Sequence, residues 1–257
     1  MSASVDVLAD RIWGAVTART AIPPLTNDVP ELTVDAAYDV QDAVIAKHLD
    51  TGATITAAKL GLTSTAKQRQ MNVAEPLYGW MTDAMVLPGD NVLETSRFIQ
   101  PRVEPEVAFM TGTELAGPGV TAAHVLEATE WVAPAIDVLD SRFTGYRFTL
   151  ADVTADNSSA AAYAIGEPQP LESDLRLTGC VFQKNGDLAA TAAGAEVMEH
   201  PAAAMAWFVR KLHQRGRSLP AGSLVLAGAW TAAIQIEPGD IVHAEFDRLG
   251  GVTVRCI

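Results

Sequence analysis

The chain has 257 residues, of which 49% are apolar and 19% charged, enough to build the core of one globular domain with at most a small appendage. Its formal net charge of −13 argues against nucleic acid or an anionic membrane as a partner, because both attract a basic surface. No uninterrupted apolar run approaches the roughly 18 residues that a membrane-spanning helix needs.

The first 52 residues predict a helical appendage. Helical spacing of apolar residues covers residues 4–20 and 33–50, and Thr33 stands where the N-cap of the second helix is expected. The proline-rich residues 22–30 between them predict a rigid connector. The start of the chain lacks the basic and apolar regions of a signal peptide, and its two cysteines are far apart, which predicts a cytoplasmic protein.

The remainder, residues 53–257, predicts a β-rich catalytic domain. One helix is expected to begin at Pro201 and to end before Gly216, and Asn185-Gly186 predicts a hairpin turn. Many strands without regular βαβ units indicate an α+β fold, a mixed β-sandwich roll, and no glycine-rich nucleotide-binding motif is present. Strands are expected at residues 54–60, 103–110, 131–139, 148–154, 160–165, 176–183, 223–227, 241–246 and 252–256.

Two carboxylates stand two residues apart in the apolar run of residues 102–109. Since alternate residues of a strand share a face, Glu104 and Glu106 would project side by side. Their repulsion calls for a positive partner, and hard divalent cations such as Mg²⁺ prefer carboxylate oxygens. The alternative is a solvated edge strand, with both glutamates on its wet face and Pro105 marking the edge.

A second predicted strand carries another acidic residue, Asp137, between two apolar neighbours. A charged residue in such surroundings needs a partner, so Asp137 is a candidate third ligand. Three carboxylates and waters would suit Mg²⁺ or Mn²⁺ with positions open for a substrate. The five histidines and two cysteines show no zinc-ligand spacing, and Asp140 with Arg142 could form a purely structural ion pair.

Three other basic residues could carry chemistry. Lys59 lies in the otherwise uncharged run of residues 55–64, so it either reaches the surface or is held against a negative partner. Arg142 and Arg147 are the best-placed guanidinium groups for binding a substrate carboxylate, although each could be an ordinary member of an ion pair.

Polar residues at two further places have an ordinary explanation beside a functional one. Ser158 and Ser159, at the end of residues 155–159, could contact a substrate or only satisfy their own turn. His200 precedes Pro201 at the predicted helix start, where capping the helix is the simpler role.

Several segments stand in a characteristic order along the chain: residues 59–64 (KLGLTS), 101–106 (PRVEPE), 140–142 (DSR), 155–159 (ADNSS) and 232–240. Together they resemble the hydratase/decarboxylase family of aromatic meta-cleavage pathways, which belongs to the fumarylacetoacetate hydrolase fold superfamily. The resemblance runs from about Thr26 to Ile257. It implies a mixed β-sandwich roll with an N-terminal helical part, a Mg²⁺ or Mn²⁺ site, and 2-oxo or 2-hydroxy dienoic acids as substrates.

The resemblance also assigns roles to individual residues. It places the family's metal-binding Glu-x-Glu on Glu104 and Glu106, and its third carboxylate on Asp137, where members of this branch usually have Glu. The active-site lysine of the family falls on Lys59, in agreement with the functional interpretation of that residue.

Two sister activities share this scaffold. Hydratases of the family tend to have an aspartate where this chain has Leu77, followed by Tyr78 and Gly79, so a candidate acid/base group is missing here. Residues 140–148 are also similar to the decarboxylase pattern. The resemblance therefore implies decarboxylation of 2-oxohex-3-enedioate, with an apolar pocket near Leu77 and Tyr78 around its distal carboxylate.

Three alternatives stay open at this stage. The first is a hydratase acting on 2-hydroxypenta-2,4-dienoate, and the second is a C–C hydrolase, which would need a water-activating His or Glu. The third is an inactive structural partner of a hydratase, suggested by Asp137 in place of Glu. We also expect a homo-oligomer, and a complex with a sister hydratase.

Overall fold

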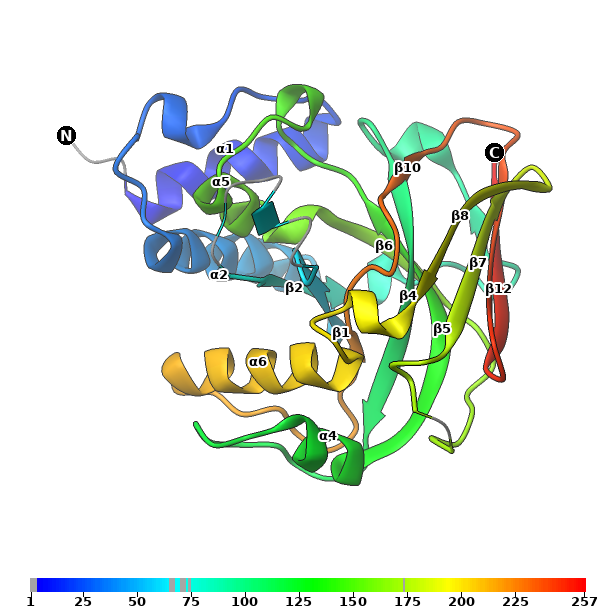
Figure 1. Cartoon of the computed structure of the whole chain (residues 1–257). Coiled ribbons are helices and arrows are strands. Elements are labelled where there is room, and N and C mark those ends of the chain that lie inside the picture. The colour runs from blue at the N-terminus through cyan, green and yellow to red at the C-terminus, as the bar shows by residue number, and fades with distance from the viewer. Residues whose placement is uncertain (1–3, 65–67, 70–72, 74, 173) are drawn as a thin grey trace.

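The computed structural model describes residues 4–64, 68–69, 73, 75–172 and 174–257 (Figure 1). Helices α1 (Val5–Ala18) and α2 (Val34–Asp50) confirm the two predicted N-terminal helices. The side chain of Thr33 accepts a hydrogen bond from the Ala36 N–H and so caps α2, as predicted. No helix among these residues is long and apolar enough to cross a membrane.

Two sheets form the rest of the molecule and confirm the α+β fold (Figure 1). The larger has the order β2-β1-β9-β4-β5-β6, with β10 also pairing with β4; the smaller has the order β3-β12-β11-β7-β8. The larger sheet consists of β1 (Ile55–Gly61), β2 (Leu77–Thr82), β4 (Arg102–Thr111), β5 (Thr129–Leu139), β6 (Ala160–Ile165), β9 (Leu224–Leu226) and β10 (Ile234–Gln235). The smaller consists of β3 (Val92–Leu93), β7 (Gly179–Lys184), β8 (Asp187–Ala193), β11 (Ile241–Phe246) and β12 (Gly250–Cys256).

The strand predicted at residues 148–154 is wrong. This segment enters helix α5 (Leu150–Ala155), and Thr149 begins it with a capping box: its side chain accepts from the Asp152 N–H, while the Asp152 side chain accepts from the Thr149 N–H. The strand predicted at residues 176–183 begins too early, because β7 starts at Gly179.

Two more helices pack near the sheets. Helix α6 (Pro201–Gln214) confirms the predicted helix, and the His200 ring caps it by accepting from the Ala202 N–H, as expected. Helix α4 (Ala122–Ala128) was not predicted, and neither was β2. The hairpin predicted at Asn185-Gly186 is confirmed, with β8 as its second strand.

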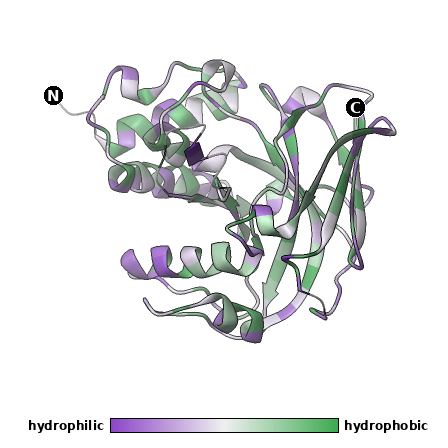
Figure 2. Ribbon diagram, in the orientation of Figure 1, coloured by the Kyte–Doolittle hydropathy of each residue, from purple (hydrophilic) through white to green (hydrophobic). Residues whose placement is uncertain are grey.

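The apolar core lies between the sheets and under the helices, and the central strands are mostly apolar (Figure 2). The N-terminal helices share an apolar cluster with α5: Leu8, Ile12 and Val44 pack together with Ala151 and Ala155. These helices therefore rest on the segment that leads into β6. The division of the chain after residue 52 stays a prediction.

Candidate metal centre and active site

Strands β4 and β5 bring the three predicted carboxylates together. Glu104 pairs with Asp137 across the two strands, and Glu106 follows on the same face of β4. A carboxylate oxygen from each of the three lies within 4.8 Å of the others. Glu104 is 8% exposed, and Glu106 and Asp137 are 0% exposed. The alternative of a solvated edge strand is therefore wrong.

Pro105 is tolerated in this interior strand because it faces a gap in the pairing. On the side of β4 away from β5, β9 pairs with Ala108 to Met110 and β10 pairs with Arg102 and Val103, so neither strand reaches Pro105. The Pro105 carbonyl accepts a hydrogen bond from the Trp230 N–H at 3.0 Å.

Glu106 is buried with an incomplete set of partners. Its Oε2 accepts from the Gly228 N–H at 2.7 Å, whereas Oε1 accepts no hydrogen bond from the described residues. Burial raises the pKa of Glu106 well above its usual range, the charge of Asp137 adds to this, and Lys59 opposes it. A buried carboxylate oxygen without a donor is the position that a cation would fill.

Lys59, on β1, brings a positive charge to the cluster. Its Nζ lies 2.9 Å from Asp137 Oδ2 and donates to the Ser158 carbonyl at 3.1 Å. Burial alone would lower the pKa of Lys59, but the charges of Asp137, Glu106 and Glu104 outweigh it and raise that pKa. The described residues of the cluster are three carboxylates and one ammonium group, and their oxygen donors fit a divalent cation that prefers oxygen ligands.

The turn at residues 157–159 sets the direction of Lys59. Asn157, Ser158 and Ser159 all have left-handed backbones, with φ of 51°, 57° and 54°. The Asn157 amide fixes this turn on β2, because Oδ1 accepts from the Trp80 N–H at 2.8 Å and Nδ2 donates to the Trp80 carbonyl at 2.7 Å. Gly79 makes room for it, since a Cβ there would lie 2.4 Å from the Asn157 carbonyl oxygen.

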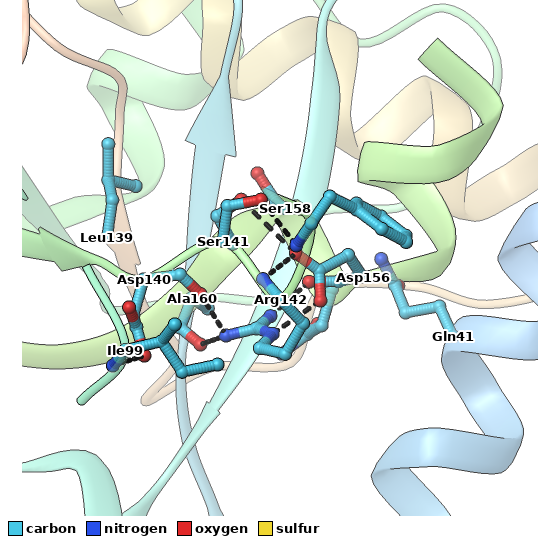
Figure 3. A network of polar contacts seen from close by, with 12 residues as sticks. Gln41, Ile99, Leu139, Asp140, Ser141, Arg142, Asp156, Ser158 and Ala160 are labelled. Carbon is cyan, nitrogen blue, oxygen red and sulfur yellow. Dashed lines mark hydrogen bonds and ion pairs between the residues drawn. The ribbon is translucent and has the colours of Figure 1, made fainter. Parts of the chain in front are cut away.

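A second buried charge cluster holds the same turn from behind (Figure 3). The Arg142 guanidinium pairs with the Asp156 carboxylate and donates to the carbonyls of Asp140, at 2.6 Å, and Ala160, at 3.1 Å. The Asp140 carboxylate accepts from the N–H groups of Ile99 and Gln100 instead. Burial raises the pKa of Asp156 to about 6, although Arg142 opposes the rise.

A pocket of about 260 Å³ opens beside Lys59 and Glu104. Its polar lining residues also include Arg102, Ser158 and Ser159. Its mostly apolar lining residues are Leu62, Leu77, Leu139, Tyr146, Phe148, Val153, Ala232 and Ala233. A larger cavity of about 470 Å³ lies behind the 157–159 turn, with Arg142, Asn157 and His48 in its lining, and the three clustered carboxylates do not line it.

Only some of the predicted substrate-binding residues line this pocket. Leu77, Ser158 and Ser159 line the pocket. Arg142 does not, because its guanidinium is held in the cluster behind the turn, and Arg147 is exposed outside the pocket lining. Tyr78 lies on the opposite face of β2 from Leu77, where its ring stacks on Tyr38 at 4.6 Å between centroids.

Sequence reasoning missed Arg102 as a pocket residue. Its signal was present, because Arg102, Glu104 and Glu106 stand at alternate positions of one strand and so share a face. Tyr146 and Phe148, which also line the pocket, were noticed only as part of a pattern that resembles decarboxylases.

Comparisons with known proteins agree with this arrangement. Residues 50–256 match the family model described as fumarylacetoacetate (FAA) hydrolase C-terminal. A 4-oxalocrotonate decarboxylase of Pseudomonas sp. (strain CF600) is 38% identical over 97% of this chain and 96% of that protein. A 2-hydroxyhexa-2,4-dienoate hydratase of Comamonas testosteroni is 32% identical over 98% and 97%. The solved 4-oxalocrotonate decarboxylase from Pseudomonas putida G7, complexed with magnesium and adipate, superimposes with a TM-score of 0.96 at 37% identity, covering 98% of this chain and 97% of that one.

Proposed function

We propose that this chain, which belongs to the fumarylacetoacetate hydrolase family, is a divalent-cation-dependent decarboxylase of 2-oxohex-3-enedioate (4-oxalocrotonate). The products would be 2-hydroxypenta-2,4-dienoate and CO₂. The observation that carries the proposal is the composition of the pocket. Next to the carboxylate cluster it has cations, and among the described residues that line it Glu104 is the single acidic group.

The donor set supports Mg²⁺ or Mn²⁺ held by Glu104, Glu106 and Asp137, because all three offer oxygen ligands and Glu106 Oε1 is buried without a donor. When bound, the cation would supply Lewis-acid stabilisation of the negative charge that develops on the 2-oxo oxygen of the substrate.

Lys59 would stabilise the same charge by hydrogen bonding. Asp137 and the Ser158 carbonyl occupy two of its N–H groups, which leaves one for a substrate oxygen in the pocket. The ion pair with Asp137 at 2.9 Å favours the ammonium form of the side chain, which is a poor nucleophile. We therefore assign Lys59 an electrostatic role and no covalent intermediate.

The apolar lining residues would act on the other end of the substrate. Leu77 and Phe148 offer the distal carboxylate neither a hydrogen-bond donor nor a cation, so desolvation favours its loss as neutral CO₂. The C5–C6 bond breaks, and its electron pair moves through the C3=C4 bond to the 2-oxo oxygen. One proton taken up by that oxygen completes the dienol.

Hydration of 2-hydroxypenta-2,4-dienoate is the second candidate, because hydratases are among the relatives. Adding water to an alkene needs a group that moves protons, and Leu77 cannot do this. The test compares CO₂ release from 2-oxohex-3-enedioate with hydration of the dienol at equal Mg²⁺ concentration. We expect kcat/KM to be far larger for decarboxylation. Faster hydration would refute the proposal, and inactivity in both assays would favour an inactive partner of a hydratase.

The partner that the site supports is a small 2-oxo dicarboxylate. A homo-oligomer, a complex with a sister hydratase and a cytoplasmic location remain predictions. Light scattering of the purified protein, alone and mixed with a hydratase of the same pathway, would test the first two.

A further inference from the structure

Arg102 presents a guanidinium group that has no assigned role. It lines the pocket, and its Cζ lies 4.0 Å from the centre of the Tyr146 ring. With the described residues it forms neither an ion pair nor a side-chain hydrogen bond. Arg142 differs, because the cluster behind the turn uses its donors. Arg102 therefore keeps its hydrogen-bonding fork for a ligand.

The stacking partner of Arg102 is itself fixed in place. The Tyr146 hydroxyl donates to the Leu139 carbonyl at 3.1 Å, and Leu139 is the residue that pairs with Arg102 across β4 and β5. The ring and the guanidinium are thus held by the same strand pair that positions Glu104 and Asp137. A guanidinium stacked on an aromatic ring loses less freedom when it binds a planar carboxylate.

We propose that Arg102 binds the C1 carboxylate of the substrate, the carboxylate that remains in the product. This inference rests on the proposed decarboxylation. Arg102 lies two residues from Glu104 on the same face of β4, and both line the pocket with Lys59. Arg102 therefore stands beside the carboxylate cluster, where the 2-oxo acid end of the substrate would lie.

The redistribution of charge during the reaction favours binding of Arg102 to the C1 carboxylate over the distal one. During decarboxylation the charge of the distal carboxylate disappears, so a guanidinium bound there would stabilise the ground state more than the transition state. The C1 carboxylate keeps its charge, and new charge develops on the adjacent 2-oxo oxygen. A cation at C1 therefore holds the substrate without opposing the reaction.

The test measures dissociation constants by calorimetry at saturating Mg²⁺ for two ligands, 2-oxopentanoate and 2-oxohexanedioate. Both have the 2-oxo acid end, and only the second has a distal carboxylate. We expect Arg102→Met to weaken both by a similar factor of about 10- to 100-fold, as for loss of a charge-assisted hydrogen bond. Arg102→Lys should recover part of the affinity. Arg147→Met is the matched control, since Arg147 is exposed outside the pocket, and it should bind both ligands as the wild type does.

Two results would overturn the inference. If Arg102→Met weakens only 2-oxohexanedioate, the guanidinium binds the distal carboxylate; if neither ligand is affected, it binds no substrate carboxylate. Tyr146→Leu removes the stacking ring and keeps the charge of Arg102, so it should reduce the affinity for both ligands to a smaller extent. This second variant tests the inference if Arg102→Met does not fold. Because 2-oxopentanoate binding requires no turnover, a wild type that binds it but releases no CO₂ would refute the proposed function separately.

Discussion

Two buried charge clusters of the described residues meet at the turn of residues 157–159, and they differ in the mixture of charges that they contain and in the hydrogen bonding of Glu106. In the cluster behind the turn, Arg142 pairs with the Asp156 carboxylate and donates to three carbonyls, and the Asp140 carboxylate accepts hydrogen bonds from two backbone N–H groups. In the cluster at the pocket, the described residues supply three carboxylates and one ammonium group, and Glu106 Oε1 accepts no hydrogen bond from them.

The difference separates a structural use of buried charge from a functional one. A buried ion pair whose remaining groups are hydrogen-bonded fixes a backbone conformation but has little capacity for a ligand. An excess of buried negative charge is unfavourable by itself and is relieved by binding a cation. Substitutions in the first cluster should therefore reduce stability, and substitutions in the second should reduce binding and turnover.

The largest effect is expected from breaking the ion pair of Arg142 and Asp156 in the cluster behind the turn. Arg142→Met leaves the buried Asp156 carboxylate without its cation and should lower the free energy of unfolding by about 3–5 kcal/mol. Urea denaturation measures this change. The double variant Arg142→Met/Asp156→Leu should recover much of the loss. A single variant as stable as the wild type would show that the pair does not hold the turn.

Removing the ammonium group from the pocket cluster should reduce catalysis instead. Lys59→Met should lower kcat by about 100- to 1000-fold, the range for loss of one charge-stabilising donor. Mg²⁺ affinity, measured by calorimetry, should be retained, because Lys59 offers no ligand to a cation. Borohydride treatment with substrate should leave the wild type unlabelled, and a reduced adduct on Lys59 would contradict its electrostatic role.

The turn that joins the clusters can be displaced without changing any charge. Gly79→Ala places a Cβ 2.4 Å from the Asn157 carbonyl oxygen, so the turn must shift. We expect about 1–3 kcal/mol lower stability and a reduced kcat, since the Ser158 carbonyl would no longer direct Lys59. Gly89→Ala, where a Cβ meets no atom within 4 Å, is the matched control. Equal turnover in both variants would mean that the turn does not position Lys59.

The smallest effect concerns His48, whose charged form is disfavoured by burial and by the nearby Arg142. Burial, with a contribution from Arg142, lowers the pKa of His48 from 6.5 to about 4. Because the unfolded chain takes up this proton first, His48 contributes stability above pH 6.5 that is lost as the pH falls toward 4. His48→Gln should therefore reduce the stability difference between pH 7 and pH 5 by about 1 kcal/mol, allowing for solvent screening. An unchanged pH profile would contradict this.

The sequence predicted the elements whose signals are long or local. Strands β4 and β5 are apolar over many residues, and the caps at Thr33 and His200 lie beside the helices that they begin. Helix α5 was mistaken for a strand because its apolar run is short, and such a run fits either structure. The overlooked signal was Thr149 followed by Asp152, the two residues of the capping box.

At the site, too, the sequence predicted contacts that depend on local spacing and missed contacts that depend on the fold. Glu104 and Glu106 share a face by local periodicity, so their proximity could be predicted. Asp137 and Lys59 were candidates because each is a charge in an apolar or uncharged run, and the resemblance assigned both to the same site. The sequence could not show that Arg142 pairs with Asp156, because that contact depends on the fold of the intervening β5–α5 segment. Tyr78 was misplaced because β2 was not predicted, and without a strand its alternation with Leu77 could not be applied.

Thermal unfolding with and without Mg²⁺ tests most directly that the pocket cluster holds excess charge for a divalent cation. We expect Mg²⁺ at about 100 times its Kd to stabilise the wild type by roughly 2.7 kcal/mol and to raise its Tm. Glu106→Gln, which removes one charge and can still accept from the Gly228 N–H, should have a higher Tm without Mg²⁺ and almost no response to it. Glu127→Gln, at an exposed position of α4, should respond as the wild type does. A response to Mg²⁺ in Glu106→Gln equal to that of the wild type would contradict the assignment of this cluster as the metal site.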